Sequence, residues 1–421
     1  MSQFYDALET RDPSQRESDL MARLPAQIEY ALKHSPGWAK HLGSINAASI
    51  NSRSALATLP VLRKSDLKAL QTEVPPFGGL TTIAAGQLGG LYMSPGPIFD
   101  AEAHGDDPWR AGRALHAAGV RAGQVLQNCF GYHMTPGAWM VHYAARKIGA
   151  AVIPAGTGQT EQQIELIRAL KPDAYVGTPS FLRIIIEKAQ QSGADISKLK
   201  RALLAAEALP PSLRSWFKEQ GISSVLQWYG TADLGMIAYE TEVAGEVVPG
   251  MMLDEELILE IVRPGTGDTV PEGEVGEIVI TNFNRAYPMI RFGTGDMSAV
   301  LIGSSPCGRT NTRIKGWLGR ADQTTKVRGM FVHPGQVAEI IKRHPQIKKA
   351  RLVVSGEMAN DHMLLKCETQ EHLSAEDLMI LQTELKETVR DITKLRSDIE
   401  LVPSVTLPND GKVIEDARNY S

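Results

Sequence analysis

Residues 125–154 read VLQNCFGYHMTPGAWMVHYAARKIGAAVIP, and this stretch sets the pattern for the middle of the chain. The apolar run Val125 to Phe130 has the length of a buried strand, and Pro136 to Ile148 has apolar residues at helical spacing until Gly149 stops it. Ala151 to Pro154 is strand-like again. We therefore predict two parallel strands in one sheet, joined by a right-handed helical crossover.

The alternation of strand and helix fills residues 110–230. Further strands are predicted near Tyr175–Gly177, Ala202–Ala206 and Val225–Trp228. A helix is predicted to start at a capping box formed by Thr160 and Gln163. Because ligands bind where parallel strands end at their carboxyl edge, we expect residues just after these strands to form a site.

The flanking segments have other patterns. Residues 1–75 read as a helical layer, with Leu20, Leu24, Ile28 and Leu32 at four-residue spacing, and residues 255–320 read as antiparallel strands. Residues 321–421 read as a smaller α/β unit. We predict an α/β protein with a large N-terminal domain of parallel and mixed sheets, residues 1–320, and a small C-terminal α/β domain, residues 321–421.

The composition excludes several classes of protein. With 44 basic and 48 acidic residues and a formal charge of −4, the chain has no basic block that would follow a nucleic-acid backbone. Its three cysteines are far apart, which disfavours a disulfide framework or a zinc knuckle. We see no signal peptide and no apolar run of about 20 residues. A cytoplasmic protein without a membrane or nucleic-acid partner is expected.

Four short stretches in the second half of the chain each place a charged residue at or near the end of a glycine-containing run. They are YGTAD at 229–233, RFGTGD at 291–296, GRAD at 319–322 and GK at 411–412. Each alone is more often a turn than a site. In this order, and together with IP at 153–154, GQTEQQ at 158–163, KP at 171–172 and TPS at 178–180, they resemble the phenylacetate–CoA ligase branch of the adenylate-forming superfamily.

This resemblance implies a reaction in two steps. A carboxylic acid attacks the α-phosphate of ATP, which gives an acyl-adenylate and pyrophosphate, and the thiol of CoA then displaces AMP. A carboxylate becomes a good acylating agent only when its oxygen becomes a leaving group, so the protein must position the phosphates and neutralise developing charge. The resemblance therefore implies ATP, Mg²⁺ and CoA as cofactors and a small carboxylic acid as substrate. Dimers are common in this branch, and the oligomeric state stays open.

The resemblance also assigns roles to single residues. Lys412 matches the lysine that contacts the reacting carboxylate and the α-phosphate, and Asp233 stands where the family has a glutamate that binds Mg²⁺. Asp296 matches the aspartate that accepts from the ribose hydroxyls, and Arg320 the arginine near ribose and phosphate. Asp322 matches the hinge about which the C-terminal domain moves as a lid.

Two further groups complete the predicted site. The adenine side is assigned to Tyr229, which stacks on the base, and to Ala205, Ala206, Glu207, Gly230 and Thr231. The substrate pocket is assigned to Phe130, Tyr132 and His133. Six of these residues have a structural role as the alternative: an exposed lysine after a turn for Lys412, a turn cap for Asp296, a surface ion pair for Arg320 and Asp322, a core aromatic for Tyr229, and a hydrogen-bonded loop residue for His133.

The sequence departs from the family at the phosphate end. An Ala-Asp pair, Ala232-Asp233, stands where the family has Ser or Thr followed by Glu. The phosphate loop of the family is rich in Ser, Thr and Gly and carries a lysine, whereas residues 91–100 here read LYMSPGPIFD. Prolines remove backbone N–H donors, so this loop lacks the usual cradle for β- and γ-phosphates.

Three hypotheses about function follow. The first is an ATP-dependent aryl- or acyl-CoA ligase. The second is an adenylating enzyme that passes its acyl group to a carrier protein or an amine, since the first step uses the same residues. The third is a catalytically silent homologue that binds a nucleotide or acyl-CoA, which the altered loop at 93–97 motivates.

Overall fold

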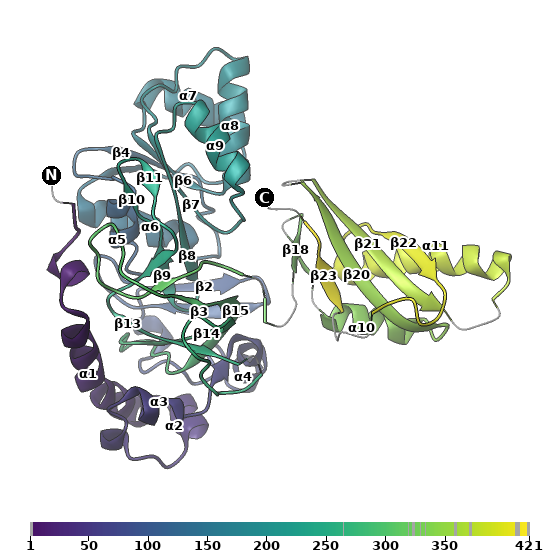
Figure 1. The fold of residues 1–421 in the computed structure, drawn as a ribbon, viewed down its shortest axis with the longest axis horizontal. Coiled ribbons are helices and arrows are strands. Elements are labelled where there is room, and N and C mark those ends of the chain that lie inside the picture. The colour runs from purple at the N-terminus through teal and green to yellow at the C-terminus, as the bar shows by residue number, and fades with distance from the viewer. Residues whose placement is uncertain are drawn as a thin grey trace. The chain divides into compact units, whose positions relative to one another are not determined.

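The computed structural model describes residues 3–263, 265–318, 320–321, 325–328, 330–332, 334–357, 360–369, 373–408 and 413–418. The chain divides into two compact units, Met1–Leu318 (unit 1) and Gly319–Ser421 (unit 2). Each unit is described by itself (Figure 1).

Unit 1 contains a nine-stranded sheet in the order β16-β17-β12-β9-β8-β7-β6-β4-β5. The strands β4 to β8 run parallel, which confirms the strand–helix repeat predicted between residues 110 and 230. These strands are β4 (Val125–Asn128), β5 (Ala151–Ile153), β6 (Ala174–Gly177), β7 (Arg201–Leu204) and β8 (Ser224–Thr231). The crossover helices are α6 (Gly137–Ile148), α7 (Thr160–Leu170), α8 (Pro179–Gln191) and α9 (Pro211–Glu219).

After β8 the sheet becomes antiparallel. A tight turn leads from β8 into β9, and the two strands pair from Trp228↔Tyr239 to Thr231↔Gly235. The remaining strands are β9 (Gly235–Tyr239), β12 (Met251–Leu253), β17 (Arg313–Ile314) and β16 (Val300–Leu301), and a small ribbon of β10 (Glu242–Val243) and β11 (Glu246–Val247) stands apart. The turn between β8 and β9 therefore lies at the carboxyl edge of the last parallel strand.

A second sheet in unit 1 has the order β1-β15-β14-β13. Its strands are β1 (Leu62–Arg63), β15 (Phe292–Ser298), β14 (Gly276–Asn282) and β13 (Leu257–Val262). The antiparallel pairing of β13, β14 and β15 agrees with the antiparallel strands predicted for residues 255–320. Strand β1, from the N-terminal layer, adds to this sheet in parallel, with Leu62 opposite Phe292 and Arg63 opposite Gly293.

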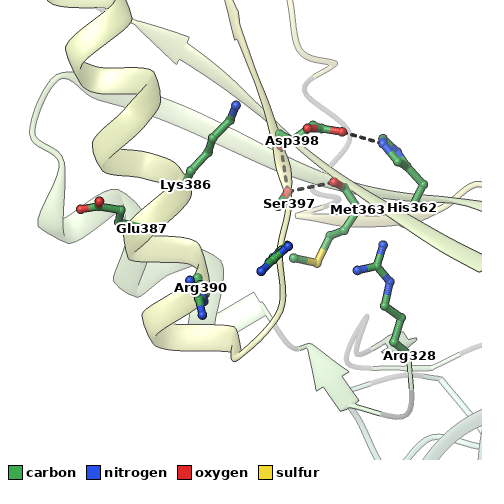
Figure 2. Close-up of a pocket in the computed structure, with 9 residues that line it drawn as sticks. Arg328, His362, Met363, Lys386, Glu387, Arg390, Ser397 and Asp398 are labelled. Atoms are coloured by element: carbon green, nitrogen blue, oxygen red, sulfur yellow. Dashed lines mark hydrogen bonds and ion pairs between the residues drawn. The ribbon is translucent and has the colours of Figure 1, made fainter.

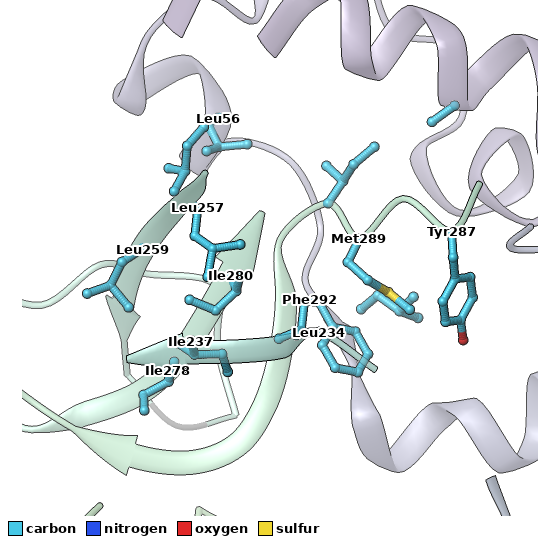
Figure 3. Packing of buried hydrophobic residues seen from close by; sticks show 14 of the residues in the cluster. Leu56, Leu234, Ile237, Leu257, Leu259, Ile278, Ile280, Tyr287, Met289 and Phe292 are labelled. Carbon is cyan, nitrogen blue, oxygen red and sulfur yellow. The ribbon is translucent and has the colours of Figure 1, made fainter. Parts of the chain in front are cut away.

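The N-terminal layer is helical, as predicted, and covers this second sheet. The helices are α1 (Pro13–His34), α2 (Pro36–Leu42), α3 (Arg53–Ala57) and α4 (Leu67–Glu73), with short 3₁₀ turns η1 (Ala7–Thr10), η2 (Ala47–Ser49), η3 (Lys64–Asp66) and η4 (Ala85–Gln87). Leu24 and Ile28 of α1 are fully buried in the same apolar cluster as Ile280 and Phe292. Figure 3 shows Leu56 of α3 near side chains of β13 and β14 in that cluster.

Two elements connect the layers of unit 1. The hairpin of β2 (Gly90–Ser94) and β3 (Ile98–Glu102) contains the altered phosphate-loop sequence, and it pairs in register from Gly90↔Glu102 to Ser94↔Ile98. Helix α5 (Gly112–Ala117) follows it and packs against α6.

The capping box predicted at Thr160 is wrong. Gln159 precedes α7 in a left-handed conformation, with φ 48°, and Thr160 is the first helical residue. The side chain of Gln163 instead accepts a hydrogen bond from Gln127 of β4 at 2.5 Å and donates to the carbonyl of Ala155 at 3.0 Å. A buried amide with partners in the sheet outcompetes the local cap, because leaving it unpaired there would cost more.

Unit 2 is a four-stranded sheet in the order β22-β21-β20-β23. Its elements are β18 (Thr325–Val327), β19 (Met330–Val332), α10 (Pro334–Arg343), β20 (Ile347–Glu357), β21 (Asn360–Thr369), α11 (Ala375–Thr393), β22 (Asp398–Val402) and β23 (Ile414–Asp416). Ser374 and Asp377 cap α11 reciprocally. This unit has its own apolar core around Leu352, Leu365 and Leu385, so the predicted large and small α/β domains are confirmed as a fold class.

The helices of the described segments are too short or too polar to cross a membrane.

Candidate active site

Asp296 on β15 is held by two aromatic side chains. The phenol of Tyr229, on β8, donates to Oδ2 of Asp296 at 2.8 Å, and the indole N–H of Trp317 donates to Oδ1 at 3.0 Å. Asp296 is 7% exposed. A carboxylate offers about four acceptor positions, a number that suits the recognition of hydroxyl groups of a ligand. Two residues from the stretches 229–233 and 291–296 are thus in direct contact.

Arg291, at the start of the second stretch, is a structural residue. Its side chain is fully buried, and Nε and Nη2 donate to the two carboxylate oxygens of Glu260 at 3.0 and 2.9 Å. It also donates to the carbonyls of Ala57 and Gly267 at 2.8 and 2.7 Å. Arg291 therefore ties β13, the N-terminal layer and the start of β15 together, which fixes the strand that carries Asp296.

Asp233, in the turn between β8 and β9, forms a short ion pair with Lys64. Nζ of Lys64 lies 2.6 Å from Oδ2 of Asp233, and the side chains are 21% and 0% exposed. Lys64 is the first residue of η3, directly after β1. The pairing of β1 with β15 brings Lys64 to the strand of Asp296, so residues 169 positions apart meet here.

Asp100, on β3, completes this group. It is fully buried, and neither of its carboxylate oxygens has a hydrogen-bond partner among the described residues; the same holds for Oδ1 of Asp233. Burial, and then the negative charge of Asp233, raise the pKa of Asp100 well above its usual value. Buried polar atoms without partners are rare in folded proteins and call for an ion, a water or a ligand. We call Lys64, Asp100 and Asp233 the Lys64 cluster.

Lys64 keeps its charge in this surrounding. Burial by itself disfavours the ammonium, but the carboxylates of Asp233, Asp100 and Asp296 outweigh it and raise the pKa of Lys64. The ammonium therefore lies in the combined field of the three acids. Lys64 was not among the residues predicted from the sequence. The absence of a lysine from residues 91–100 indicated that a cation could come from another segment. Only the pairing of β1 with β15 shows that Lys64 lies near Asp233 and Asp296.

The donor set fits a magnesium ion that arrives with a nucleotide. Within the described ranges no three Asp, Glu, His or Cys side chains are grouped closely enough to hold a metal ion by themselves. Mg²⁺ in nucleotide sites usually takes one or two carboxylates and completes its shell with waters and phosphate oxygens. The buried oxygen Oδ1 of Asp233, which lacks a partner in the described structure, suits that role.

The residues predicted for the adenine side lie at the ends of β7 and β8. Ala206 has φ 68°, a left-handed conformation that is uncommon for a residue with a side chain. Glu207 accepts from the backbone N–H of Ser180 at the start of α8, at 3.2 Å. A Cβ on Gly230 would lie 2.4 Å from the carbonyl oxygen of Gly235, so the β8–β9 hairpin itself requires glycine there. Thr231 accepts from the N–H of Leu234 and holds the same turn.

The residues predicted for the substrate pocket follow β4. Phe130 packs edge-on against Trp228, with ring centroids 6.3 Å apart. The hydroxyl of Tyr132 accepts from Asn128 at 2.8 Å and lies 3.2 Å from Nδ1 of His142, and burial raises the pKa of Tyr132 to about 12. His133, in contrast, is exposed. Phe130 and Tyr132 therefore point into the protein, and His133 points out of it.

Other predicted residues belong to the second half of the family pattern. Gly411, Lys412 and Asp322, which was predicted to be the hinge, lie outside the described residues. Arg320 belongs to unit 2, where it is half-buried.

Unit 2 also has a hollow of about 440 Å³. Figure 2 shows it between α11, the start of β22 and the turn after β18. Its lining side chains are Arg328, His362, Met363, Lys386, Glu387, Arg390, Arg396, Ser397 and Asp398. Asp398 pairs with His362 at 2.7 Å, and Arg328 donates to the carbonyl of Asp361. None of the predicted site residues lines this hollow.

Family models and known proteins give the same assignment. The model for AMP-binding enzymes matches residues 132–284, and the model for the C-terminal domain of AMP-binding enzymes matches residues 329–416. A phenylacetate–coenzyme A ligase of Thermus thermophilus is 28% identical over 83% of this chain and 80% of its own length. The phenylacetate–coenzyme A ligase of Escherichia coli is 26% identical over 98% of both chains.

Solved structures agree on the fold. A 2-hydroxyisobutyryl-CoA ligase, crystallised with 2-HIB-AMP and CoA, superposes with a TM-score of 0.80 at 24% identity, over 100% of this chain and 93% of that one. An amide bond synthetase of Marinactinospora thermotolerans superposes with a TM-score of 0.52 at 16% identity, over 93% of this chain and 92% of that one. From the matched family models and the relatives aligned over most of its length, this chain belongs to the adenylate-forming enzymes, in the phenylacetate–CoA ligase family.

Proposed function

We propose that this protein is an ATP-dependent acyl-CoA ligase, an AMP-forming acid–thiol ligase that makes an acyl-adenylate and then a CoA thioester. The contact between Tyr229 and Asp296 carries the proposal, because it joins the two stretches assigned to adenine and ribose into one site. The length over which the chain aligns with ligase relatives supports the same activity.

The first step forms one P–O bond and breaks another. A carboxylate oxygen of the acid attacks the α-phosphorus, and the bond to the oxygen that bridges the α- and β-phosphates breaks, so pyrophosphate leaves with that electron pair. Negative charge grows on the leaving group and on the α-phosphate oxygens. We assign Lys412 to the reacting carboxylate and the α-phosphate, since an ammonium is a compact charge for this purpose.

The nucleotide is assigned to residues of the motifs named above. Asp296 accepts from the ribose hydroxyls, with its orientation set by Tyr229 and Trp317. The ring of Tyr229 borders the adenine, next to the segment 205–207 and the hairpin turn that starts at Gly230 and Thr231. Arg320 is assigned to the ribose and the α-phosphate. When bound, Mg²⁺ neutralises phosphate charge, and Asp233 is the residue that would hold it.

The second step needs a different access to the acyl group. The sulfur of the CoA thiolate attacks the acyl carbon, the bond from that carbon to the phosphate oxygen breaks, and AMP leaves. We assign Asp322 to the hinge that lets the C-terminal domain move as a lid between the two steps. Phe130, Tyr132 and His133 are assigned to the acid, whose side chain these residues do not identify.

Two properties of the whole protein extend the proposal. We assign the enzyme to the cytoplasm, and its free cysteines Cys129, Cys307 and Cys367, all buried, fit a reducing compartment. We assign it a homodimer, as is common in this family. Light scattering on the purified protein measures the mass directly, and a mass of one chain would overturn the dimer.

Pyrophosphate release from a panel of aryl and short-chain acids, with and without CoA, tests the function. The ligase predicts release with at least one acid and formation of its acyl-CoA. Release that never yields an acyl-CoA would favour transfer to a carrier protein or an amine. If no acid causes release while the protein still binds AMP, both enzyme hypotheses are wrong and a silent homologue remains.

A further inference from the structure

We propose that Lys64 is the residue that binds the β- and γ-phosphates of ATP in this protein, in place of a lysine in the loop between β2 and β3. The inference rests on the proposed ATP-dependent function and names the residue for a part of that site which the motifs leave unassigned.

The β2–β3 hairpin cannot supply this cation itself. Residues 90–109 contain no lysine and no arginine, and Pro95 and Pro97 in the turn have no N–H to donate. The hydroxyl of Ser94 donates to the carbonyl of Ile98 within the hairpin, at 3.3 Å. The hairpin contributes the acid Asp100, and a positive charge for the phosphates has to come from another segment.

Lys64 comes to the hairpin from a different layer of unit 1. The ion pair with Asp233 fixes its ammonium at the turn between β8 and β9, and Asp100 of β3 lies within electrostatic range of it. Asp296, the residue assigned to ribose, is also within that range. One ammonium thus stands among the hairpin that replaces the phosphate loop, the residue assigned to Mg²⁺ and the residue assigned to the sugar.

The three side chains differ in exposure. Asp100 and Asp233 are buried, with 0% and 2% of the residue exposed. The side chain of Lys64 is 21% exposed. An ammonium has three N–H donors, and only Asp233 Oδ2 accepts from Lys64 among the described residues. The two other N–H donors make no hydrogen bond to the described residues, and we assign them to phosphate oxygens.

The acids beside Lys64 keep acceptor capacity that the described residues do not fill. Buried ion pairs offset their desolvation only when further hydrogen bonds satisfy the remaining oxygens. Asp100 lies against Ser94 and Asp233, and no other described residue donates a hydrogen bond to either of its oxygens or to Oδ1 of Asp233. A magnesium nucleotide meets both needs, because its cation satisfies carboxylate oxygens and its phosphates accept from Lys64.

The deciding experiment compares ATP with AMP, which lacks only the β- and γ-phosphates. Dissociation constants of both nucleotides, with Mg²⁺ present, are measured by calorimetry for the wild type, Lys64→Gln, Lys64→Arg and the matched control Lys68→Gln. Lys68 is exposed on α4, four residues further along the chain. Lys64→Gln is expected to weaken ATP about 10- to 100-fold and AMP less than about 2-fold, the scale of losing a charged hydrogen bond.

The variants Lys64→Arg and Lys68→Gln serve as controls for the effect of Lys64→Gln. Lys64→Arg keeps a cation and is expected to retain part of the preference for ATP, and Lys68→Gln to change neither nucleotide. Equal weakening of ATP and AMP by Lys64→Gln, or no weakening of either, would overturn the role of Lys64. If the wild type binds neither nucleotide, the proposed ATP-dependent function fails, and the inference about Lys64 fails with it.

A second measurement uses the unaltered protein, because Lys64→Gln leaves Asp233 buried without its partner and can prevent folding. Lysines are acetylated with a limiting amount of reagent, and the modification of each is followed by mass spectrometry. MgATP is expected to protect Lys64 severalfold more than AMP does, while Lys68 is modified equally in both. Equal modification of Lys64 with ATP and with AMP would show that the outer phosphates do not reach it.

Discussion

The phenol oxygen of Tyr229 lies 2.8 Å from Oδ2 of Asp296, and this hydrogen bond connects the nine-stranded sheet of unit 1 to its second sheet. The two residues are 67 positions apart in the sequence. Two stretches that look like separate turns in the sequence therefore form one site. The orientation of the acid assigned to ribose depends on the residue assigned to adenine.

Tyr229→Phe removes only the hydroxyl and keeps the ring. We expect the KM for ATP to rise about 2- to 10-fold with little change in kcat, since one hydrogen bond that orients Asp296 is lost. Steady-state pyrophosphate release at varied ATP measures this. Tyr239→Phe is the matched control, because its hydroxyl donates to Glu9 elsewhere in unit 1. The control should lower stability without a change in KM, and an equal rise in KM for both variants would contradict the role of Tyr229.

Lys412→Ala removes the ammonium assigned to the first step. We expect adenylation to fall by on the order of 10²- to 10³-fold, the scale of losing one preorganised charge-stabilising group. Thioester formation from a supplied acyl-adenylate should be spared, because the α-phosphate is no longer attacked in that step. Rapid-quench assays of the two half-reactions give both rates, and an equal loss in both would count against the assignment.

Arg291→Met breaks the buried pair with Glu260. The free energy of unfolding is expected to fall by about 3–5 kcal/mol, because an acid is left buried without its partner. Urea unfolding measures the change. The double variant Arg291→Met/Glu260→Met should recover part of the loss, and Arg183→Met, which removes an exposed pair with Glu187 on α8, should cost less than about 1 kcal/mol. A loss for Arg291→Met as small as that of Arg183→Met would refute a supporting role for Arg291.

His116 on α5 predicts a pH dependence of stability. Burial, and then the charge of Arg121, lower its pKa to about 4, while Tyr5 stacks edge-on against its ring. Between about pH 6.5 and pH 4 the unfolded chain binds a proton at this position and the folded protein does not, so stability falls as the pH is lowered through this window. Above about pH 6.5 His116 is neutral in both states and does not make the stability depend on pH.

The variant His116→Gln cannot titrate and isolates this effect. Glu9, Asp6 and Arg309 also act on His116, so the comparison uses the difference between variant and wild type at each pH. The loss of unfolding free energy from about pH 7.5 to about pH 5, measured by urea unfolding, should be smaller for the variant than for the wild type. Equal losses would show that His116 is protonated to the same extent in both states.

Local patterns in the sequence determined much of the fold. The strand–helix repeat around β4 to β8 follows from apolar spacing and from glycine and proline at the boundaries, which act within a few residues. The capping box of α11 is a local feature of the same kind. At Thr160 the local pattern failed, because Gln163 finds partners in the sheet and on a loop that no spacing reveals.

The site divides in the same way. The sequence by itself determined the family, and it marked Asp296, Tyr229 and Asp233 through the types and order of residues in short motifs. Only the tertiary structure placed Lys64 on Asp233 beside Asp100 and showed Arg291 as a buried support. These contacts join segments from different sheets and from the N-terminal layer, and their charges matter because burial removes water. Local patterns in the sequence do not show which distant residues are buried together, and only the folded structure shows this.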